Sequence, residues 1–248
     1  MGSSSDLQHR AIAVHHRLCV KYGCPIPYFH ALDPLSELVS SLLSHRTKNR
    51  DSGRAFKQLV SQFPTWVAVR DAPTELVEQA IAPCTWPEQK APRIQQVLRL
   101  VGELTNGEWS LDFLKDMPVV KARAWLEALP GVGPKTSAAV LCFSQLRGRA
   151  LPVDSHHHRV AQRLGLIPKT MAVGPSHVAL AGFLPDEWDA QQVYDHHEVM
   201  MLHGQRCCFY KNPSCDRCMV LDLCPYGQER REKNEELRTK NEKGLSTG

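Results

Sequence analysis

Four cysteines near the C-terminal end of the chain have the number and spacing to hold a metal centre. They are separated by six, two and five residues, at Cys208, Cys215, Cys218 and Cys224. Four thiolates can hold either a zinc ion or a 4Fe–4S cluster. Structural zinc sites usually contain two C-x-x-C pairs, and this segment contains one, so the spacing favours the cluster. Cys207 competes with Cys208 as the first ligand.

Two cations lie in the loops between these cysteines, at Lys211 and Arg217. Loops held rigid by a metal centre could present them to phosphate, although surface cations without a role are equally common. The remaining cysteines stand apart from this group and are predicted to be small buried side chains. They are Cys19, Cys24, Cys84 and Cys142.

A glycine-rich turn between two amphipathic segments could bind an anion. The sequence LPGVGPKT occupies residues 129–136, in which two glycines permit a tight turn and Pro134 suits the first position of a helix. The free amides of Gly131, Val132 and Gly133 would then lie at the positive end of the helix dipole. This arrangement suits a DNA phosphate.

A lysine and an aspartate follow this turn. Lys135 begins the next predicted helix, where the dipole disfavours an ammonium, and a neutral amine there could form a Schiff base with a sugar carbon. The alternative is a surface lysine that contacts phosphate. Asp154, nineteen residues later, could cap a helix, act as a base or stabilise an oxocarbenium ion. The histidines at 156–158 diverge by ~100° each on a helix and cannot chelate one ion together.

The elements that must position these residues are predicted to be helical. Apolar residues recur with helical spacing, and no alternation persists for the length of a strand. The chain is therefore expected to be all-α, with about ten short helices. The predicted segments are 34–43, 51–63, 76–81, 94–101, 119–129, 135–146, 156–164, 176–184 and 186–203.

The composition fits a globular protein of one large or two small domains. The chain has 248 residues, of which 42% are hydrophobic and 23% charged, and its net charge of +4 permits an anionic partner without requiring one. No apolar run suits a membrane span and no secretory signal begins the chain, so nine cysteines indicate a reducing, cytoplasmic location. Residues 1–5 are expected to be flexible, and residues 227–248 to form a charged, disordered tail or a frayed helix.

Three motifs in order resemble the endonuclease III family of DNA glycosylases. They are LPGVGPKTS, VDSHHHRV and LHG-x3-C-x6-C-x2-C-x5-C, within a resemblance that covers about residues 32–225. The resemblance implies a six-helix barrel with a helix–hairpin–helix over 34–147, and an iron–sulfur cluster domain formed by 1–33 and 148–226. It also implies a monomer that acts on double-stranded DNA containing damaged bases or abasic sites.

The resemblance further implies removal of oxidised pyrimidines followed by strand cleavage through β-elimination. Lys135 matches the nucleophile of the family and Asp154 its catalytic aspartate. Cys208, rather than Cys207, matches the first ligand of a 4Fe–4S cluster. His156 matches the helix that follows the aspartate and is expected to contact DNA.

Two positions depart from the family pattern. Arg46 stands where the family usually has a glutamine that fills the gap left by the flipped base. Trp86 stands at the apolar wedge, in a segment that lacks the usual glycine. An arginine can bond the widowed base and a tryptophan can stack into the duplex; alternatively, Trp86 packs against a neighbouring helix.

Two other functions remain open at this point. One is a monofunctional glycosylase for mispaired adenine or alkylated bases, which Lys135 disfavours because such relatives usually lack a lysine there. The other is a DNA-binding relative that has lost activity. The retained pair of Lys135 and Asp154 argues against that alternative, while Arg46 and Trp86 leave it open.

Overall fold

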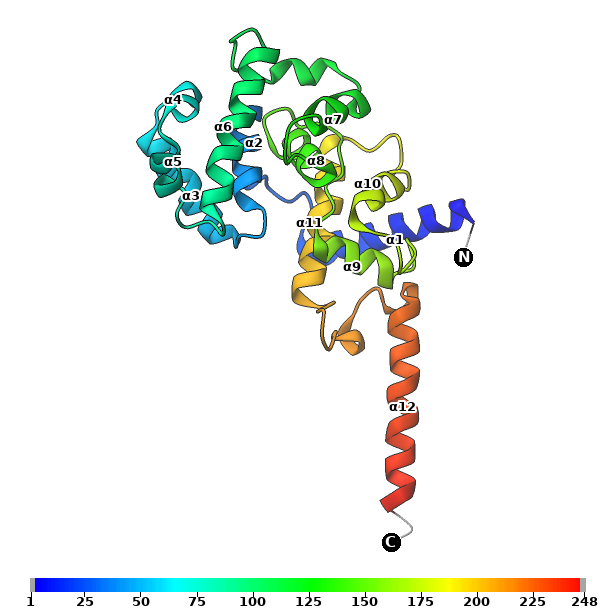
Figure 1. The fold of residues 1–248 in the computed structure, drawn as a ribbon. Coiled ribbons are helices and arrows are strands. Elements are labelled where there is room, and N and C mark those ends of the chain that lie inside the picture. The colour runs from blue at the N-terminus through cyan, green and yellow to red at the C-terminus, as the bar shows by residue number, and fades with distance from the viewer. Residues whose placement is uncertain (1–2, 246–248) are drawn as a thin grey trace. The chain divides into compact units, whose positions relative to one another are not determined.

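The computed structural model describes residues 3–245, and in this range every regular element is a helix (Figure 1). This confirms the predicted all-α class. The described helices include none with the length and hydropathy of a membrane span.

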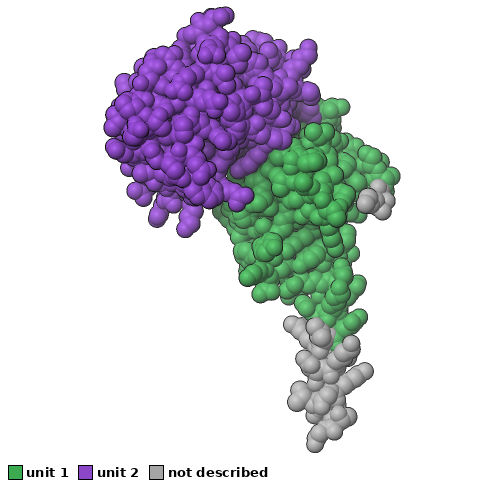
Figure 2. All heavy atoms as spheres, in the orientation of Figure 1, with its two compact units in different colours: residues 1–27, 153–248 green, residues 28–152 purple. Residues whose placement is uncertain are grey.

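The chain divides into two compact units, coloured separately in Figure 2. Unit 2 is continuous and contains residues 28–152, whereas unit 1 combines residues 1–27 with residues 153–248. The sequence places the corresponding boundaries at 34–147, so each observed boundary lies a few residues further out. The discontinuous unit contains residues from both ends of the given sequence.

Unit 2 is built around one apolar core to which all of its α-helices contribute. Its first helix begins where the sequence predicts, because the Asp33 carboxylate accepts the amides of Leu35 and Ser36 and Pro34 occupies the first turn. This helix packs against α8 (Pro134–Phe143). The elements are α2 (Pro34–Ser44), α3 (Asn49–Gln62), α4 (Trp66–Asp71), α5 (Thr74–Ala80), α6 (Pro87–Leu104), η1 (Asp112–Asp116), α7 (Val119–Glu127) and α8 (Pro134–Phe143).

Unit 1 joins the two ends of the chain through one long helix. That helix, α11 (Ala190–Arg206), packs against both α1 (Ser4–Tyr22) and α9 (Ser155–Arg163), so α1 completes a fold whose other parts follow residue 152. The elements are α1 (Ser4–Tyr22), α9 (Ser155–Arg163), α10 (Val173–Ala181), α11 (Ala190–Arg206), η2 (Cys215–Arg217), η3 (Leu221–Leu223) and α12 (Pro225–Leu245).

Both termini are more ordered than the sequence predicts. Ser3 accepts the amide of Asp6 and Asp6 accepts the amide of Ser3, and this capping box starts α1 within the segment expected to be flexible. The charged tail is helical to residue 245 rather than disordered. Ion pairs four residues apart, Glu229 with Lys233 and Arg231 with Glu235, stabilise that helix. Residues 1–2 and 246–248 lie outside the described part.

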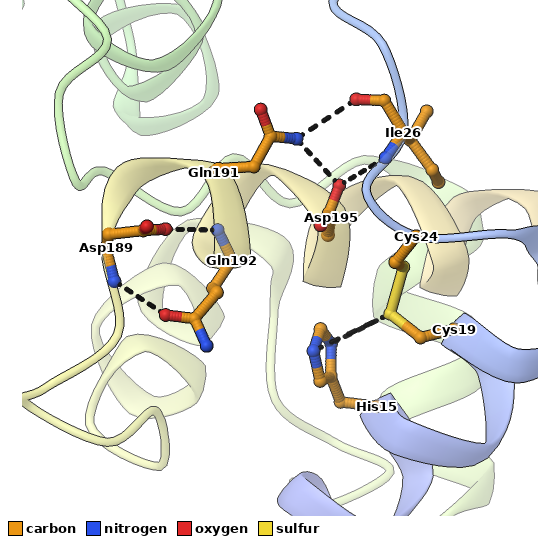
Figure 3. The surroundings of a disulfide bond; sticks show 8 residues. All are labelled: His15, Cys19, Cys24, Ile26, Asp189, Gln191, Gln192 and Asp195. Carbon is orange, nitrogen blue, oxygen red and sulfur yellow. Dashed lines mark hydrogen bonds between the residues drawn. A yellow bond between two sulfur atoms is a disulfide. The ribbon is translucent and has the colours of Figure 1, made fainter.

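The prediction that Cys19 and Cys24 are isolated buried side chains is wrong, because they form a disulfide (Figure 3). Gly23 ends α1 with a φ of 82°, which favours glycine, and turns the chain so that Cys24 returns to Cys19. Cys84 and Cys142 are buried free thiols, as predicted.

The segment after the disulfide is attached to α11 by hydrogen bonds (Figure 3). The Asp195 carboxylate accepts the amide of Ile26 at 2.8 Å and the side-chain amide of Gln191 at 2.9 Å. Gln191 also donates to the carbonyl of Ile26 at 3.0 Å. These contacts hold the N-terminal segment in unit 1.

Candidate functional site

The turn between α7 and α8 is tight, as the sequence predicts, but only two of the three amides that were predicted to be free are so. Gly131 has a φ of 81°, a backbone conformation that favours glycine, and the side chain of Arg93 packs against it, since a Cβ added there would lie 2.7 Å from Cδ of Arg93. Val132 is buried, and its amide donates to the carbonyl of Leu129 at 3.1 Å. That amide is therefore not free for an anion. Within residues 3–245, the amides of Gly131 and Gly133 donate no backbone hydrogen bond.

A polar network that sequence reasoning missed fixes the two helices of the turn. Ser137 donates to the Glu127 carboxylate at 2.6 Å, and Arg123 donates to Glu127, to Ser137 and to the carbonyl of Pro134. Ser137 is fully buried. The network therefore ties α7 to the first turn of α8, where Lys135 lies.

Lys135, Arg46 and Trp86 line one pocket in unit 2, although they come from distant parts of the sequence. The pocket has a volume of about 460 Å³. Its described lining residues include five potential cations and no carboxylate. The lining consists of Leu42, His45, Arg46, Trp86, Gln89, Lys90, Arg93, Ile94 and Lys135.

The two residues that depart from the family pattern have left-handed backbone conformations. Arg46 has a φ of 50° and Trp86 a φ of 55°, and such values are uncommon outside glycine. Trp86 precedes α6, and 47% of its surface is exposed. An indole with that exposure is available to a ligand, which argues against a role confined to packing.

Lys90 holds the loop that carries Arg46. Its ammonium donates to the carbonyls of Leu43 and His45 at 2.7 and 2.8 Å and to the hydroxyl of Thr47 at 2.8 Å. Lys90 is buried, which lowers the pKa of its ammonium. The sequence did not reveal that Lys90 fixes this loop, because the interaction depends on how folding brings three oxygen atoms together around its ammonium.

His45 connects this loop to the start of α8. Its Nε2 lies 2.8 Å from the hydroxyl of Thr136, the residue after Lys135. Burial and the positive charges of Lys135, Lys90 and Arg93 lower the pKa of His45 to about 4. The ring is therefore neutral near pH 7, and it positions the helix end without adding a charge to the pocket.

Asp154 lies in unit 1 and caps α9, as the sequence predicts. Its carboxylate accepts the amide of His157 at 2.7 Å. Glu198 of α11 is buried near it, and that burial, together with the charges of Asp154 and Asp195, raises the pKa of Glu198 to about 7. A second carboxyl that exchanges a proton near neutral pH therefore lies within the electrostatic range of Asp154.

His156, expected to contact DNA, lies where α9 and α11 approach each other closely. A Cβ added to Gly204 would lie 2.8 Å from Cβ of His156. Arg159 donates to Nδ1 of His156 at 3.2 Å and to the carbonyls of Gly204 and Cys208 at 2.8 and 3.1 Å. His156 is half-buried, so part of its ring remains accessible.

A group of aromatic rings forms part of the core of unit 1. His157 is fully buried with its ring centroid 5.4 Å from that of His196 and 5.8 Å from that of His197. His15 packs against Trp188 with centroids 4.3 Å apart. Burial is the main cause that lowers the pKa of His15 to about 4, of His196 to about 3 and of His157 well below its usual value.

We expect this core to make stability sensitive to acid. A histidine whose folded-state pKa is depressed stabilises the fold above its unfolded pKa of about 6.5, and that contribution is lost as the pH falls toward the folded value. Each such group can change the unfolding free energy by up to about 1.4 kcal/mol per pH unit. Glu198, whose pKa is raised to about 7, opposes this trend between about pH 4.5 and 7, but it is one group against several histidines.

Urea unfolding between pH 7 and pH 4.5 measures the effect. The unfolding free energy should fall with the pH, and His196→Gln should reduce the slope relative to the exposed control His9→Gln. A free energy that is independent of pH over this range would contradict the expectation.

The four predicted cysteine ligands line one cavity in unit 1, together with Cys207 and His203. The nearby donors suit thiolates, because Arg163 donates to Sγ of Cys208 at 3.2 Å and the amide of Gly227 donates to Sγ of Cys224 at 3.3 Å. A Cβ on Gly227 would lie 2.7 Å from Cδ1 of Leu221, so the backbone packs closely against that side chain beside the cavity.

The remainder of that cavity is mainly apolar, with Val160, Leu164, Pro213, Val220 and Leu221 in its wall. These donors and this wall fit a buried iron–sulfur cluster, whose properties depend on hydrogen bonds to sulfur and on exclusion of solvent. Lys211 and Arg217 are exposed on the cysteine segment, as contact with phosphate requires.

The sequence and the fold of this chain are both similar to those of known proteins. Residues 39–178 match the HhH-GPD superfamily of base excision DNA repair proteins. The chain is 31% identical over 199 residues to endonuclease III of Thermotoga maritima, covering 80% of this chain and 85% of that protein. It is 30% identical over 196 residues to endonuclease III of Escherichia coli, covering 79% and 85%.

A plant relative is longer than this chain. The Arabidopsis thaliana protein named "Putative DNA glycosylase At3g47830" is 35% identical over 174 residues, which are 70% of this chain and 57% of the relative. Among solved structures, a trapped endonuclease III–DNA covalent intermediate matches 93% of this chain with a TM-score of 0.75 and 24% identity, over all of that chain. That likeness supports the fold.

Proposed function

Because this chain belongs to the HhH-GPD superfamily of base excision DNA repair proteins, and within it to the endonuclease III family, we propose that it removes oxidised pyrimidines from duplex DNA and then cleaves the strand. The observation that carries the proposal is the pocket lined by Lys135, Arg46 and Trp86. It places an amine beside two side chains suited to a displaced base and its unpaired partner.

Lys135 supplies the nucleophile in this proposal. Its amine attacks C1′ of the flipped nucleotide, the bond from C1′ to the base breaks, and the sugar ring opens to an imine that promotes β-elimination. The amine must be neutral to attack. Lys135 lies in the first turn of α8, in a pocket that is also lined by other basic side chains.

Asp154 supports the same step through its carboxylate. It accepts the proton that the attacking amine releases, or it stabilises positive charge that develops at the sugar. It also caps α9 through the amide of His157. Any test of its chemical role must therefore separate the reaction from the stability of the helix.

DNA binding is proposed to depend mainly on phosphate contacts. The amides of Gly131 and Gly133, with the exposed cations Lys211 and Arg217, offer donors that carry no base sequence information. His156, half-buried beside the cysteine segment, offers one further contact.

Cys208, Cys215, Cys218 and Cys224 are the proposed ligands of a 4Fe–4S cluster, which supplies structural order to the segment that carries Lys211 and Arg217. The thiolate donors and the apolar wall of the cavity support this assignment. Iron and sulfide analysis of freshly purified, full-length protein tests it. Stoichiometric zinc and no iron in protein that was expressed with ample iron would contradict it.

The proposed activity is tested with duplex DNA that contains one thymine glycol or one abasic site. Strand cleavage on both substrates, with release of the base from the first, is the expected result. Release of the base without cleavage would indicate a monofunctional glycosylase. Binding without either reaction would indicate a relative that has lost activity.

Replacing Trp86 with alanine should weaken base excision more than cleavage at a preformed abasic site. Extrusion of a paired base is needed only in the first reaction, and stacking on an aromatic ring contributes about 1–3 kcal/mol. We therefore expect a loss of about 5- to 100-fold in excision and little change in cleavage.

Single-turnover rates on the two substrates measure the difference. Trp86→Phe keeps an aromatic wedge and should retain most of the excision rate. Equal losses of rate on both substrates would indicate that Trp86 only maintains the shape of the pocket and does not act as a wedge.

A further inference from the structure

The cysteine cavity contains a second set of metal-binding groups that differs from the four proposed cluster ligands. The set consists of His203, Cys207 and Cys218, and their ligand atoms all lie within 4.8 Å of one another. His203 and Cys207 are 2% and 3% exposed. Cys218 is the one residue that belongs to both sets.

The backbone at the end of α11 brings two of these residues together. The carbonyl of His203 accepts the amides of both Cys207 and Cys208, at 3.0 and 2.8 Å. The helix therefore ends in a tight turn that keeps Cys207 beside the imidazole. The neighbouring Cys208 has a different environment, since its Sγ accepts a hydrogen bond from Arg163 at 3.2 Å.

The imidazole of His203 is oriented as a ligand. Its Nδ1 lies 3.4 Å from the hydroxyl of Tyr22, and its Nε2 lies 3.6 Å from Sγ of Cys218. In metal sites, a histidine ligand usually has its second ring nitrogen hydrogen-bonded in this way, which fixes the ring. Tyr22 is on α1, so the N-terminal helix contributes to this orientation.

We propose that His203, Cys207 and Cys218 bind one zinc ion when the iron–sulfur cluster is absent. Zinc accepts one imidazole and two thiolates, with a fourth position open to water. Two S–H bonds break and two Zn–S bonds form, the two protons leave to solvent, and no electron is transferred. This inference rests on the proposed cluster in one respect: the shared Cys218 makes zinc and the cluster mutually exclusive.

The proposed zinc site includes Cys207, which is not part of the cysteine pattern of the family. The spacing of six, two and five residues uses Cys208 as its first ligand and leaves Cys207 without a part in the cluster. The Cys207 thiol, with the His203 imidazole and the Cys218 thiol within 4.8 Å, supplies two of the ligand types that zinc binds. A chain that has not received iron and sulfide can thus keep the end of α11 and the cysteine segment joined through zinc.

The test uses the full chain, freed of iron and titrated anaerobically with cobalt(II), which reports thiolate ligation through a charge-transfer band. The unsubstituted protein and Cys208→Ala should show the band, and added zinc(II) should remove it. Cys207→Ala should bind cobalt at least tenfold more weakly. Cys142→Ala, which removes a buried thiol from unit 2, is the matched control and should bind normally.

Iron content after expression with iron distinguishes the two sites. Cys207→Ala should retain iron and Cys208→Ala should lose it, the reverse of the cobalt result. Absence of iron from the unsubstituted protein, with the cobalt pattern intact, would overturn the proposed cluster and support the zinc site.

Three results would overturn the inference. They are equal loss of cobalt in Cys207→Ala and Cys208→Ala, normal cobalt binding in Cys207→Ala, and an unsubstituted apo chain that binds no cobalt. Circular dichroism accompanies each titration. If Cys207→Ala does not fold, His203→Gln must show the same loss of cobalt, and normal binding by that variant would equally overturn the site.

Discussion

Lys135→Gln should abolish covalent trapping of the protein on damaged DNA by borohydride. Only an amine can form the imine that borohydride reduces, and glutamine keeps a polar side chain, one atom shorter than lysine, without a nucleophile. Loss of the covalent route should lower strand cleavage by about 10³-fold or more. Gel separation of the adduct after reduction, on DNA that contains thymine glycol, measures the effect directly.

DNA binding provides the control for this variant. The amides of the α7–α8 turn and the other cations of the pocket remain in Lys135→Gln, so affinity for an uncleaved duplex should change by only a few-fold. Lys90→Gln makes a useful comparison because it removes a different amine from the same pocket. Trapping by Lys135→Gln would show that another amine is the nucleophile, and the proposed role of Lys135 would be wrong.

Asp154→Asn should slow base excision by about 10²- to 10⁴-fold, the usual contribution of a group that transfers protons or stabilises charge. The asparagine retains a side-chain oxygen that can accept the amide of His157, and asparagine caps helices about as well as aspartate. The loss should therefore come from the missing carboxylate, with little change in the melting temperature. Single-turnover excision and a thermal melt on the same sample separate the two quantities.

Asp154→Ala gives the matched comparison. It removes both the carboxylate and the cap, so it should lose the same activity and also about 0.5–2 kcal/mol of stability. If Asp154→Asn keeps nearly full activity while Asp154→Ala loses it, the residue acts through the helix cap alone.

Much of the fold could be read from local sequence patterns. Asp33 and Pro34 marked the start of α2, and Asp154 marked the start of α9, because a cap depends on a few adjacent residues. The helix α1 was missed although its capping box is also local. The short α4 was missed as well, and the tail helix α12 was expected only as an alternative to disorder, because the composition of both segments is less periodic.

The pocket could be predicted only in part. Motif positions indicated Lys135, Arg46 and Trp86 separately, but their common pocket depends on how α2, α6 and α8 pack. Lys90 and His45 acquire their roles from carbonyl and hydroxyl groups brought together by that packing. The disulfide similarly depends on a left-handed glycine that turns Cys24 back to Cys19.

The division of unit 1 between the two ends of the chain sets an order for its assembly during synthesis. Residues 28–152 can leave the ribosome and form unit 2 while α1 still lacks its partner helix. At about 5–20 residues per second, α1 waits roughly 10 to 35 seconds for α11 to be translated. Throughout that interval its apolar face, which includes Val14 and Leu18, lacks the helix α11 that packs against it in the folded unit, and no metal can be held by the cysteine cavity before residues 208–224 have been translated.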